Sequence, residues 1–363
     1  MNELEQARQI INQTDEKIAQ LFTQRMEAVR QVAAYKQKHG LPVLDAKREQ
    51  ELIKANAARV ADPQLQPYYV GFLQDVMKHS RAFQEALLEG IKVAFCGVQG
   101  AFASIAARKI FPHSCQCPYP SFEAAYQAVV NGECDLAVLP LENSTAGEVV
   151  QVMDMLFNGN LFVTGIYDLP IRHHLLGRPD AHRSQIRQVI SHPQALAQCE
   201  NYIKQHGFTQ ITCENTAVAA MQVAQGSDST VAAIASQDTA QLYGLKVLDS
   251  NINQESLNTT RFAVLSRCLS QNVGKDKHSV LMFTVRNEAG SLAEAVRIIG
   301  DEGFNMRCLR SRPMKDLLWQ YYFYVEVEGD LLSPKGQEML EKLKKCCERL
   351  KHLGSFDYPA ILH

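Results

Sequence analysis

The stretch 4–38, LEQARQIINQTDEKIAQLFTQRMEAVRQVAAYKQK, decides how the N-terminal part of the chain folds. Its apolar residues recur at spacings of three, four and seven, which predicts one long helix with an apolar seam. The seam consists of Leu4, Ala7, Ile11, Ile18, Leu21, Ala28 and Val32. Arg25 interrupts the seam at a position where an apolar side chain would fit. The helix is therefore expected to carry a permanent charge on the face that it buries.

Three cations share that narrow face. Arg8, Arg25 and Lys36 lie within about 20° of one another around the axis, and cations on a buried face need anions. Arg25 and Lys36 are about 16 Å apart along the axis, so two extended side chains can converge on a small dianion between them. Arg8 lies about 25 Å from Arg25 and must come from a second, antiparallel copy of the helix to join such a site. The alternative is a coiled-coil helix whose Arg and Lys side chains extend outward to solvent.

Composition excludes several classes of function. The chain has 363 residues and a net charge of −2, enough for two or three domains and without the basic character that nucleic acid or a membrane surface attracts. No apolar run reaches the length of a membrane span, and the N-terminus is acidic and does not resemble a signal peptide. The ten cysteines lack a usual zinc spacing. We expect reduced thiols, a cytoplasmic location, and neither metal nor cofactor.

Residues 1–90 are predicted to be helical throughout. The residues 40–43 form a turn after the first helix, and Asp45 can cap a second helix. The pair Asp62-Pro63 predicts the start of a third helix that runs to about Leu88. Ser80 and Gln84 are one turn apart on it and share a face.

Residues 91–268 alternate between short apolar runs and helical stretches, which predicts an α/β domain with largely parallel strands, two lobes and a cleft at the strand ends. The expected strands are Lys92–Cys96, Asp135–Leu139, Leu161–Ile166, Gln188–Ser191, Ile211–Cys213, Val231–Ala235 and Arg261–Leu265.

A polar, glycine-containing linker at 270–275 separates this domain from a block at 277–361. Its expected elements are a strand at Val280–Val285, a helix, strands near Met306–Ser311 and Trp319–Val327, and a helix from about Pro334 to Leu350. This βαββα order predicts a small α+β sandwich, a layout that often serves interaction or regulation.

The helical part resembles the helical chorismate mutases in the motifs ARQIINQTDEKIAQLFTQR, Lys36, LPVLDAKRE, and Ser80 with Gln84. That reaction is a pericyclic rearrangement, so the catalyst must orient the substrate and stabilise charge on the breaking ether oxygen. The resemblance implies that Arg8 enters from a partner subunit, that Arg8 and Arg25 bind carboxylates, and that Lys36 and Gln84 donate to the ether oxygen. Arg48 would position the substrate, and Glu49 would accept from the ring hydroxyl. The complete candidate set is Arg8, Arg25, Lys36, Asp45, Arg48, Glu49, Ser80 and Gln84.

Three polar clusters in the middle domain lie where strands meet helices or turns: LPLENSTAG at 139–147, VISHP at 189–193 and NTTRF at 258–262. Free amides and hydroxyls at such places can bind carboxylates. With KVAFCGVQGAF at 92–102 and SHPQALAQC at 191–199, they resemble prephenate dehydratase, although Val98, Ala103 and Ala146 depart from the usual pattern. By that resemblance Thr260 is the proton donor, Asn143, Ser191 and Gln198 line the cleft, and Arg261 binds a carboxylate. The candidate set is Asn143, Ser144, Thr145, Ser191, Gln198, Thr260, Arg261 and Phe262.

The last block resembles the ACT domain, a ferredoxin-like amino-acid-sensing module, in NEAGSL at 287–292 and RSRP at 310–313. The resemblance implies that phenylalanine binds between two such domains through Asn287, Gly290, Ser291, Leu292, Ser311 and Arg312. Arg310 stands where the family commonly has Glu, and Ser291 and Ala293 replace Ala and Val.

Together these features resemble a bifunctional chorismate mutase and prephenate dehydratase. The expected architecture is a helical domain, a two-lobed domain like the periplasmic binding proteins, and an ACT domain, assembled as a homodimer or a dimer of dimers. Chorismate and prephenate are the expected substrates and phenylalanine the expected inhibitor. Two alternatives remain: a dehydratase that prefers arogenate, and a two-lobed amino-acid sensor whose helical segment only dimerises. The adjacent His173 and His174 are expected to be structural, since neighbours on a strand face opposite ways.

Overall fold

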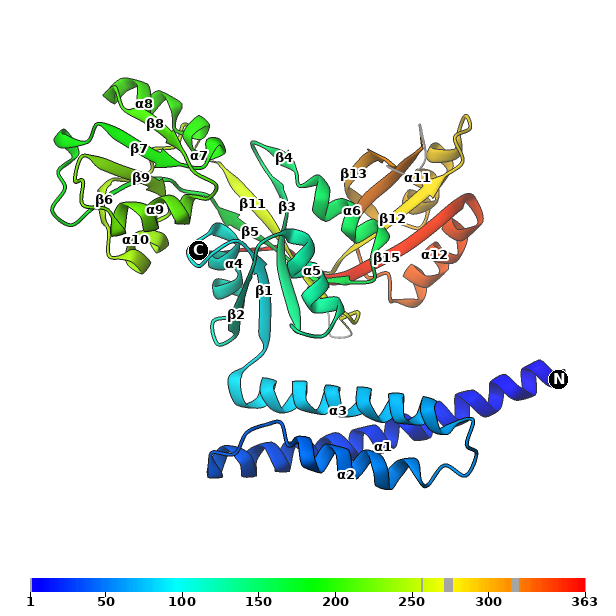
Figure 1. Ribbon diagram of the computed structural model, residues 1–363. Helices are drawn as coiled ribbons and strands as arrows, with labels where there is room; N and C mark the ends of the chain where they lie inside the picture. The colour runs from blue at the N-terminus through cyan, green and yellow to red at the C-terminus, as the bar shows by residue number, and fades with distance from the viewer. Residues whose placement is uncertain (1, 256, 271–276, 315–319, 363) are drawn as a thin grey trace. The chain divides into compact units, whose positions relative to one another are not determined.

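The computed structural model describes residues 2–255, 257–270, 277–314 and 320–362 and divides into two compact units. The first unit comprises residues 1–91 with 113–115, and the second contains the rest of the chain. Figure 1 shows that the first unit is helical and that the second is built on sheets. The helical N-terminus and the α/β character that the sequence predicts are confirmed.

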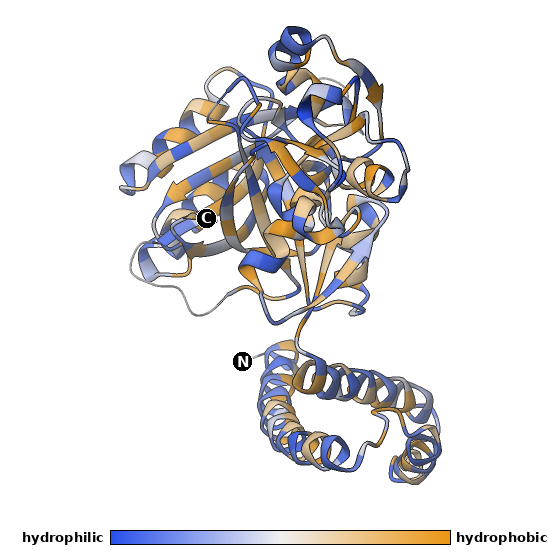
Figure 2. Ribbon diagram, turned by 90° about the vertical axis from the view of Figure 1, so that its left-hand side faces the viewer, coloured by the Kyte–Doolittle hydropathy of each residue, from blue (hydrophilic) through white to orange (hydrophobic). Residues whose placement is uncertain are grey.

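The first unit has three helices: α1 (Glu3–His39), α2 (Ala46–Ala57) and α3 (Gln66–Glu89). Asn2 and Glu5 form a capping box at the start of α1, and Gly40 ends it in a left-handed conformation with φ 63°. Asp45 caps α2 by accepting from the Arg48 backbone N–H at 3.0 Å. Hydrophilic and hydrophobic residues alternate along all three helices (Figure 2), as expected of elements with one buried face.

The third helix begins later than the Asp62-Pro63 signal predicts. α3 starts at Gln66, with Pro67 in its first turn. Asp62 instead accepts from the backbone N–H of Gln64 at 2.9 Å, which closes a turn before the helix. An aspartate side chain that accepts from the backbone two residues ahead can stabilise a turn, and the same residue type can cap a helix. The Asp62-Pro63 pair alone therefore does not distinguish a turn from a helix start.

The second unit begins with a seven-stranded sheet in the order β16-β5-β11-β3-β1-β2, with β4 beside β3. Helices α4 (Phe102–Ile110), α5 (Phe122–Val130) and α6 (Val150–Asn158) belong to this first lobe. Its strands are β1 (Lys92–Cys96), β2 (Cys115–Tyr119), β3 (Leu136–Asn143), β4 (Gly147–Glu148), β5 (Phe162–Pro170), β11 (Thr259–Ser266) and β16 (Ala360–Ile361).

The chain leaves this lobe at 171–173, builds a second lobe, and returns at 250–258. The second lobe has the sheet order β10-β6-β9-β7-β8. Its strands are β6 (His174–Gly177), β7 (Gln188–Ser191), β8 (Thr209–Thr212), β9 (Val231–Ala235) and β10 (Lys246–Asp249). Its helices are η1 (Arg183–Gln185), α7 (Pro193–Gln198), α8 (Glu200–His206), α9 (Thr216–Gln225) and α10 (Gln237–Tyr243).

The expectation of largely parallel strands needs correction, because both lobes hold mixed sheets. In the first lobe β1 and β3 are parallel, but β11 pairs antiparallel with both β3 and β5. In the second, β6 is antiparallel to both of its neighbours. The antiparallel strands adjoin the two crossings between the lobes, where the chain reverses instead of passing through a helix.

The C-terminal part forms a four-stranded antiparallel sheet in the order β13-β14-β12-β15. Its elements are β12 (Lys277–Val285), α11 (Ser291–Asp301), β13 (Asn305–Pro313), β14 (Tyr321–Glu328), α12 (Pro334–Cys346) and β15 (Cys347–Asp357). Residues 271–275 of the linker predicted at 270–275 and the predicted strand start at Trp319 lie outside the described residues.

The helix expected to reach Leu350 ends at Cys346, and the rest of that stretch is β15. Leu353 and Phe356 of β15 are buried in the core of the first lobe, together with Val280 and Met282 of β12. The local composition favours a helix, but a strand here pairs with β12 and buries these side chains, so tertiary packing overrides local propensity.

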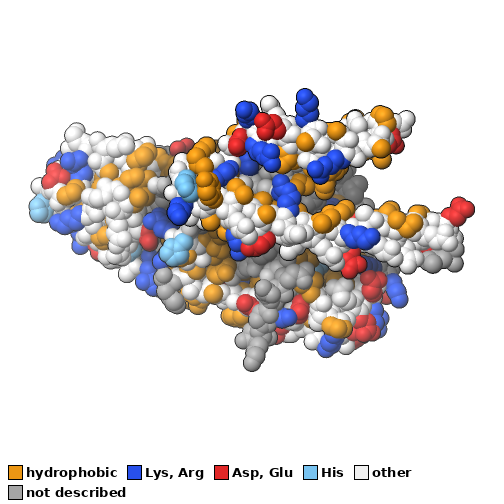
Figure 3. Space-filling view, turned by 90° about the horizontal axis from the view of Figure 1, so that it is seen from below, with side chains coloured by type: hydrophobic (Ala, Val, Ile, Leu, Met, Phe, Trp, Pro, Cys, Tyr) orange, Lys and Arg blue, Asp and Glu red, His pale blue; other side chains and the backbone are white. Residues whose placement is uncertain are grey.

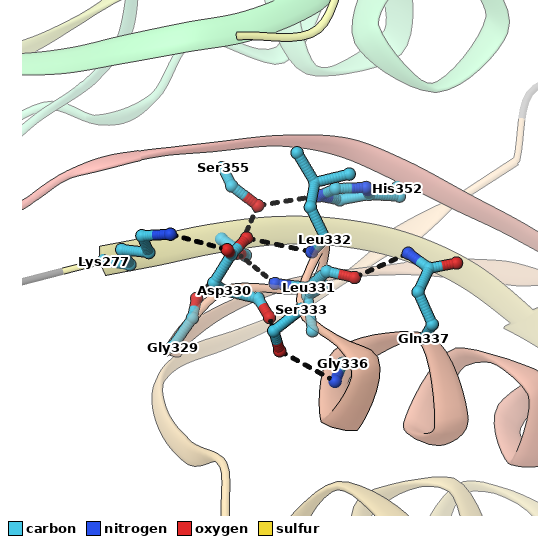
Figure 4. A network of polar contacts seen from close by, with 11 residues as sticks. Lys277, Gly329, Asp330, Leu331, Leu332, Ser333, Gly336, Gln337, His352 and Ser355 are labelled. Atoms are coloured by element: carbon cyan, nitrogen blue, oxygen red, sulfur yellow. Dashed lines mark hydrogen bonds and ion pairs between the residues drawn. The ribbon is translucent and has the colours of Figure 1, made fainter. Parts of the chain in front are cut away.

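A polar network holds the start of α12 against the sheet (Figure 4). The Asp330 carboxylate accepts from Lys277 Nζ at 2.7 Å and from the Leu332 N–H at 2.9 Å. The buried hydroxyls of Ser279 and Ser355 lie 2.7 Å apart, and Ser333 caps the helix. The contacts drawn all join residues of this domain, so we interpret this network as structural.

Gly354 allows β15 to lie directly against β5. A Cβ at this position would stand 1.9 Å from the Val163 carbonyl oxygen. We expect Gly354→Ala to lower the free energy of unfolding of the second unit by about 3 kcal/mol or more. The new Cβ would clash with the backbone of β5, and neither strand can move aside without losing its pairing. The matched control is Gly300→Ala in α11, where a Cβ meets nothing within 4 Å. Urea unfolding measures both; equal stabilities would contradict the prediction.

Candidate functional sites

The first candidate site is a cavity of about 130 Å³ among the three helices. All the predicted residues of this unit line it except Arg8, together with the unpredicted Arg81. The lining is Arg25, Val29, Lys36, Val43, Asp45, Arg48, Glu49, Leu52, Met77, Ser80, Arg81 and Gln84. One helix turn separates Ser80 from Gln84, and both side chains are buried, at 4% and 7% exposed.

The cavity is strongly cationic. The Arg25 guanidinium donates to Ser80 Oγ, and burial lowers the Arg25 pKa from its ordinary value. Lys36 Nζ donates to the Val43 carbonyl, and Arg81 pairs with Glu49. Gln84 Oε1 is buried without a hydrogen-bond partner among the described residues. Of the four cations, only Arg81 pairs with a carboxylate in a described contact, which suits a cavity made for an anionic ligand.

Arg8 lies near the start of α1, about 25 Å along the helix axis from Arg25, and is exposed. The apolar seam around it is exposed too: Leu4, Ile11 and Leu21 are 58%, 57% and 64% exposed. Figure 3 shows apolar side chains exposed on the helices of this unit. The seam that the sequence predicts to be buried is therefore not buried within one chain.

The second candidate site is a cavity of about 290 Å³ between the two lobes of the second unit. Four predicted residues line it: Asn143, Gln198, Thr260 and Phe262. Its walls also include the first residues of α4 and α9, and the N-cap residue of α4 is Ala101, which offers no side-chain cap. Free backbone N–H groups of a helix start are suited to bind a carboxylate.

Thr260 and Asn143 are paired across β11 and β3. Asn143 Nδ2 donates to Thr260 Oγ1 at 2.9 Å, while Asn143 Oδ1 accepts from the Thr145 hydroxyl at 2.7 Å. Gln198 of the other lobe donates to Thr145 Oγ1 at 2.9 Å. Because Thr260 Oγ1 accepts from Asn143, its own proton is available to a ligand in the cavity.

Two predicted residues face away from this cavity. Ser191 is fully buried and donates to the Ile234 carbonyl at 2.5 Å. Arg261 follows Thr260 on β11, and its guanidinium contacts three carboxylates. The nitrogen–oxygen distances are 3.0 Å to Asp168, 3.4 Å to Glu326 and 3.6 Å to Glu142. Neighbouring residues on a strand face opposite sides. The structure thus places Arg261 in an ion cluster and not on the expected carboxylate of a ligand.

Ser144 lies beside the cavity without lining it, and its hydroxyl accepts from the Thr259 N–H at 3.0 Å. Residues that the sequence analysis did not select also line the cavity, notably His173, His192 and Asn215. A cavity of similar volume lies beside His174 and Leu362 but contains none of the predicted residues. His173 and His174 do face different cavities, and within the described residues no group of three or more His, Cys, Asp or Glu is placed to bind a metal.

The motif residues of the C-terminal sheet lie in two places. Gly290 begins α11 in a left-handed conformation with φ 91°, followed by Ser291 and Leu292. Arg310 and Arg312 of β13 point toward the first lobe, where Arg310 pairs with Glu142 and Glu148 and Arg312 lies 3.6 Å from Glu148. Ser311 lies between them and is exposed.

Comparisons with known proteins find relatives of both parts of the chain. A family model of chorismate mutase type II matches residues 7–85, and one of prephenate dehydratase matches residues 93–269. A bifunctional chorismate mutase/prephenate dehydratase of Enterobacter agglomerans is 31% identical, with 98% of this chain and 96% of that protein covered.

Two further relatives cover the second unit. Arogenate dehydratase/prephenate dehydratase 2 of Arabidopsis thaliana is 32% identical over 73% of this chain and 72% of its own length. The crystal structure of the Arthrobacter aurescens prephenate dehydratase in complex with L-Phe is similar with a TM-score of 0.67. It is 26% identical and covers 75% of this chain and 93% of that one. Within the described residues, no helix is long and apolar enough to cross a membrane.

Proposed function

This chain belongs to the family of bifunctional chorismate mutase/prephenate dehydratases, and on that premise we propose which residues perform each reaction. The chain rearranges chorismate to prephenate and converts prephenate to phenylpyruvate. The agreement of both family models with two separate cavities carries this conclusion. The alternative of an amino-acid sensor with an inert helical segment is set aside.

The helical cavity holds chorismate by its charges. The rearrangement needs neither a nucleophile nor net proton transfer, so orientation and charge stabilisation are the whole task. Arg25 binds a carboxylate, and Arg48 positions the bound substrate. Lys36 and Gln84 donate to the ether oxygen, where charge develops, and Glu49 accepts from the ring hydroxyl. Gln84 lines the cavity, and its Nε2 donates to the Ser80 carbonyl at 3.3 Å, so the amide must exchange this long hydrogen bond for one to the ligand.

A second copy of the chain completes this site. The cavity of about 130 Å³ is smaller than the roughly 300 Å³ at which ligand pockets usually begin. The exposed apolar seam of α1 provides the surface that a second, antiparallel α1 would cover. That arrangement brings Arg8 of one chain toward Arg25 of the other. A homodimer is therefore the minimal active form, and a dimer of dimers would preserve the same site.

In the second cavity Thr260 protonates the departing hydroxyl of prephenate. The bond between the ring and its carboxylate breaks, the electron pair enters the ring, and the hydroxyl leaves as water with the Thr260 proton, which solvent then returns to Thr260. Carbon dioxide departs, and aromatisation drives the step, so even a weak acid is sufficient. The helix starts at α4 and α9 provide N–H groups for carboxylates.

The C-terminal sheet is proposed to be an ACT domain at 277–361 that binds phenylalanine through its two motifs. Its sheet order β13-β14-β12-β15 with two helices supports the proposal of a ferredoxin-like ACT domain. It contacts the dehydratase lobe directly behind the catalytic pair, because Arg310 binds Glu142 and Glu326 binds Arg261. These two partners adjoin Asn143 and Thr260 on their strands. A ligand that favours one arrangement of this domain can thus change the dehydratase cleft.

Phenylpyruvate formation from chorismate tests the proposal as a whole. We expect conversion without any added cofactor, and a slower second step when phenylalanine is present. Chorismate absorbance follows the first reaction and phenylpyruvate absorbance the second. Loss of chorismate without phenylpyruvate, followed by product formation from arogenate, would assign the arogenate preference instead. The ten free cysteines fit the proposed cytoplasmic location.

A further inference from the structure

In the hydrogen bonds around Thr260, backbone N–H groups determine which atom donates and which accepts. The N–H groups of Thr145 and Ala146 both donate to Asn143 Oδ1, at 3.1 and 3.0 Å. A backbone N–H is only a donor, so this contact fixes which end of the Asn143 amide is oxygen. The amide nitrogen must then face Thr260 Oγ1 at 2.9 Å and Asn258 Oδ1 at 2.8 Å.

The same argument assigns the donors and acceptors that continue this chain of hydrogen bonds into the second lobe. Because the Asn258 oxygen accepts from Asn143, its nitrogen is the end that donates to Gln198 Oε1, at 3.0 Å. The same Gln198 oxygen lies 2.9 Å from His173 Nε2. An amide oxygen only accepts, so His173 Nε2 must carry a proton. The side-chain amides of Asn143, Asn258 and Gln198 therefore connect Thr260 to His173, and they require the His173 form that is protonated on Nε2.

The surroundings of His173 keep it in that form. Its side chain is 2% exposed, and its Nδ1 is buried without a partner among the described residues. The edge of the Phe102 ring packs against it at 5.6 Å between centroids. Burial lowers the pKa of His173, so the ring is neutral near pH 7 with its one proton on Nε2.

We propose that His173 is a positioning residue for the dehydration, which holds Gln198 and, through Asn258 and Asn143, keeps the Thr260 hydroxyl aimed at the substrate as a donor. The inference rests on the proposed role of Thr260. Without the Nε2 proton, Gln198 Oε1 keeps one donor instead of two, and its amide can turn. Its contact with Thr145 in the first lobe then weakens, and with it the closure of the cleft around Asn143.

Two variants test the hydrogen bond apart from the volume of the ring. His173→Leu fills the space but cannot donate, and we expect a decrease in dehydratase kcat of about tenfold, as for the loss of one positioning hydrogen bond. His173→Gln places an amide N–H near the position of Nε2 and should restore most of the rate. Mutase activity in the same samples should remain unchanged, because its residues lie in the other unit.

The matched control is the neighbouring His174. Its Nδ1 accepts from the Asn251 N–H at 3.3 Å and takes no part in the described contacts of Gln198. His174→Asn retains an acceptor near that position, and we expect dehydratase kcat within about twofold of the parent. A decrease equal to that of His173→Leu would show a general packing effect and overturn the proposal.

A second measurement on the unchanged chain does not depend on any variant folding. Histidine labelled with ¹⁵N reports which ring nitrogen carries the proton, and His173→Gln identifies the signal. We expect the Nε2–H form from pH 7 to 8; a neutral ring with its proton on Nδ1 would overturn the proposal. If the parent chain forms phenylpyruvate, Thr260→Val does not and His173→Leu is unimpaired, only this inference is wrong. An active Thr260→Val variant would instead remove the proposed function of Thr260.

Discussion

Thr260→Val is expected to lower the dehydratase kcat by about a thousandfold, within the range for loss of a general acid, while chorismate mutase activity stays at the parent level. Valine has the shape of threonine and suits a strand, so β11 should keep its pairing with β3 and β5. What disappears is the only proton that the pair Asn143–Thr260 offers to the cavity, since Asn143 Nδ2 already donates to Thr260 Oγ1.

Phenylpyruvate formation from prephenate measures this effect, and chorismate loss in the same preparation provides the internal control. Thr260→Ser keeps the hydroxyl and is the matched variant, for which we expect the rate to fall by about tenfold or less. Near-normal phenylpyruvate formation by Thr260→Val would rule out Thr260 as the acid. A parallel loss of mutase activity would instead indicate misfolding of the whole chain.

The sequence predicts the helical domain and its cavity well because the information is local. The long helix α1, the cap at Asp45 and the i, i+4 pair Ser80 and Gln84 each follow from residue types and spacing along one helix. Arg25, Lys36 and Glu49 meet at one cavity as expected. Arg81 escaped notice because a charged residue beside Ser80 has the ordinary appearance of an exposed helix position.

The second cavity is predictable only in part, because its residues come from distant segments. Asn143, Gln198 and Thr260 were selected through their motifs, and the structure brings them to one cavity. Arg261 belongs to the same motif as Thr260 but faces the other side of the sheet, where it contacts Glu326 of the C-terminal sheet. Without knowledge of that sheet, no local feature distinguishes a ligand arginine from one in an ion cluster.

His173 shows a further limit of the sequence. A histidine next to a second one, just before a buried strand, is most simply read as a core residue, and its burial agrees with that interpretation. Its importance emerges only from the direction of hydrogen bonds among Asn143, Asn258 and Gln198, which depends on two backbone N–H groups. Such a direction is a property of the assembled site and leaves no pattern in the sequence.

Mixing two inactive variants is expected to restore mutase activity, and this is the sharpest consequence of a site shared between chains. Arg8→Ala and Arg25→Ala alone should each lower mutase activity by at least about a hundredfold, since each removes a charged contact to a carboxylate. In a mixed dimer one site combines the intact Arg25 of one chain with the intact Arg8 of the other. Equal amounts of the two, unfolded together and refolded, should recover about a quarter of the parent activity in a twofold dimer.

The control for refolding is each variant treated alone, which should recover dehydratase but not mutase activity. If the cations of α1 all served a site within one chain, mixing would give only the residual rates, because every chain would still lack one arginine. If Arg8 merely extended to solvent, Arg8→Ala alone would remain active, and the mixture would show only the activity of that variant. Recovery in the mixture, absent from either variant alone, requires that Arg8 and Arg25 reach one substrate from two copies of α1. This requirement explains why an exposed apolar seam and an unpaired cation lie on one helix face.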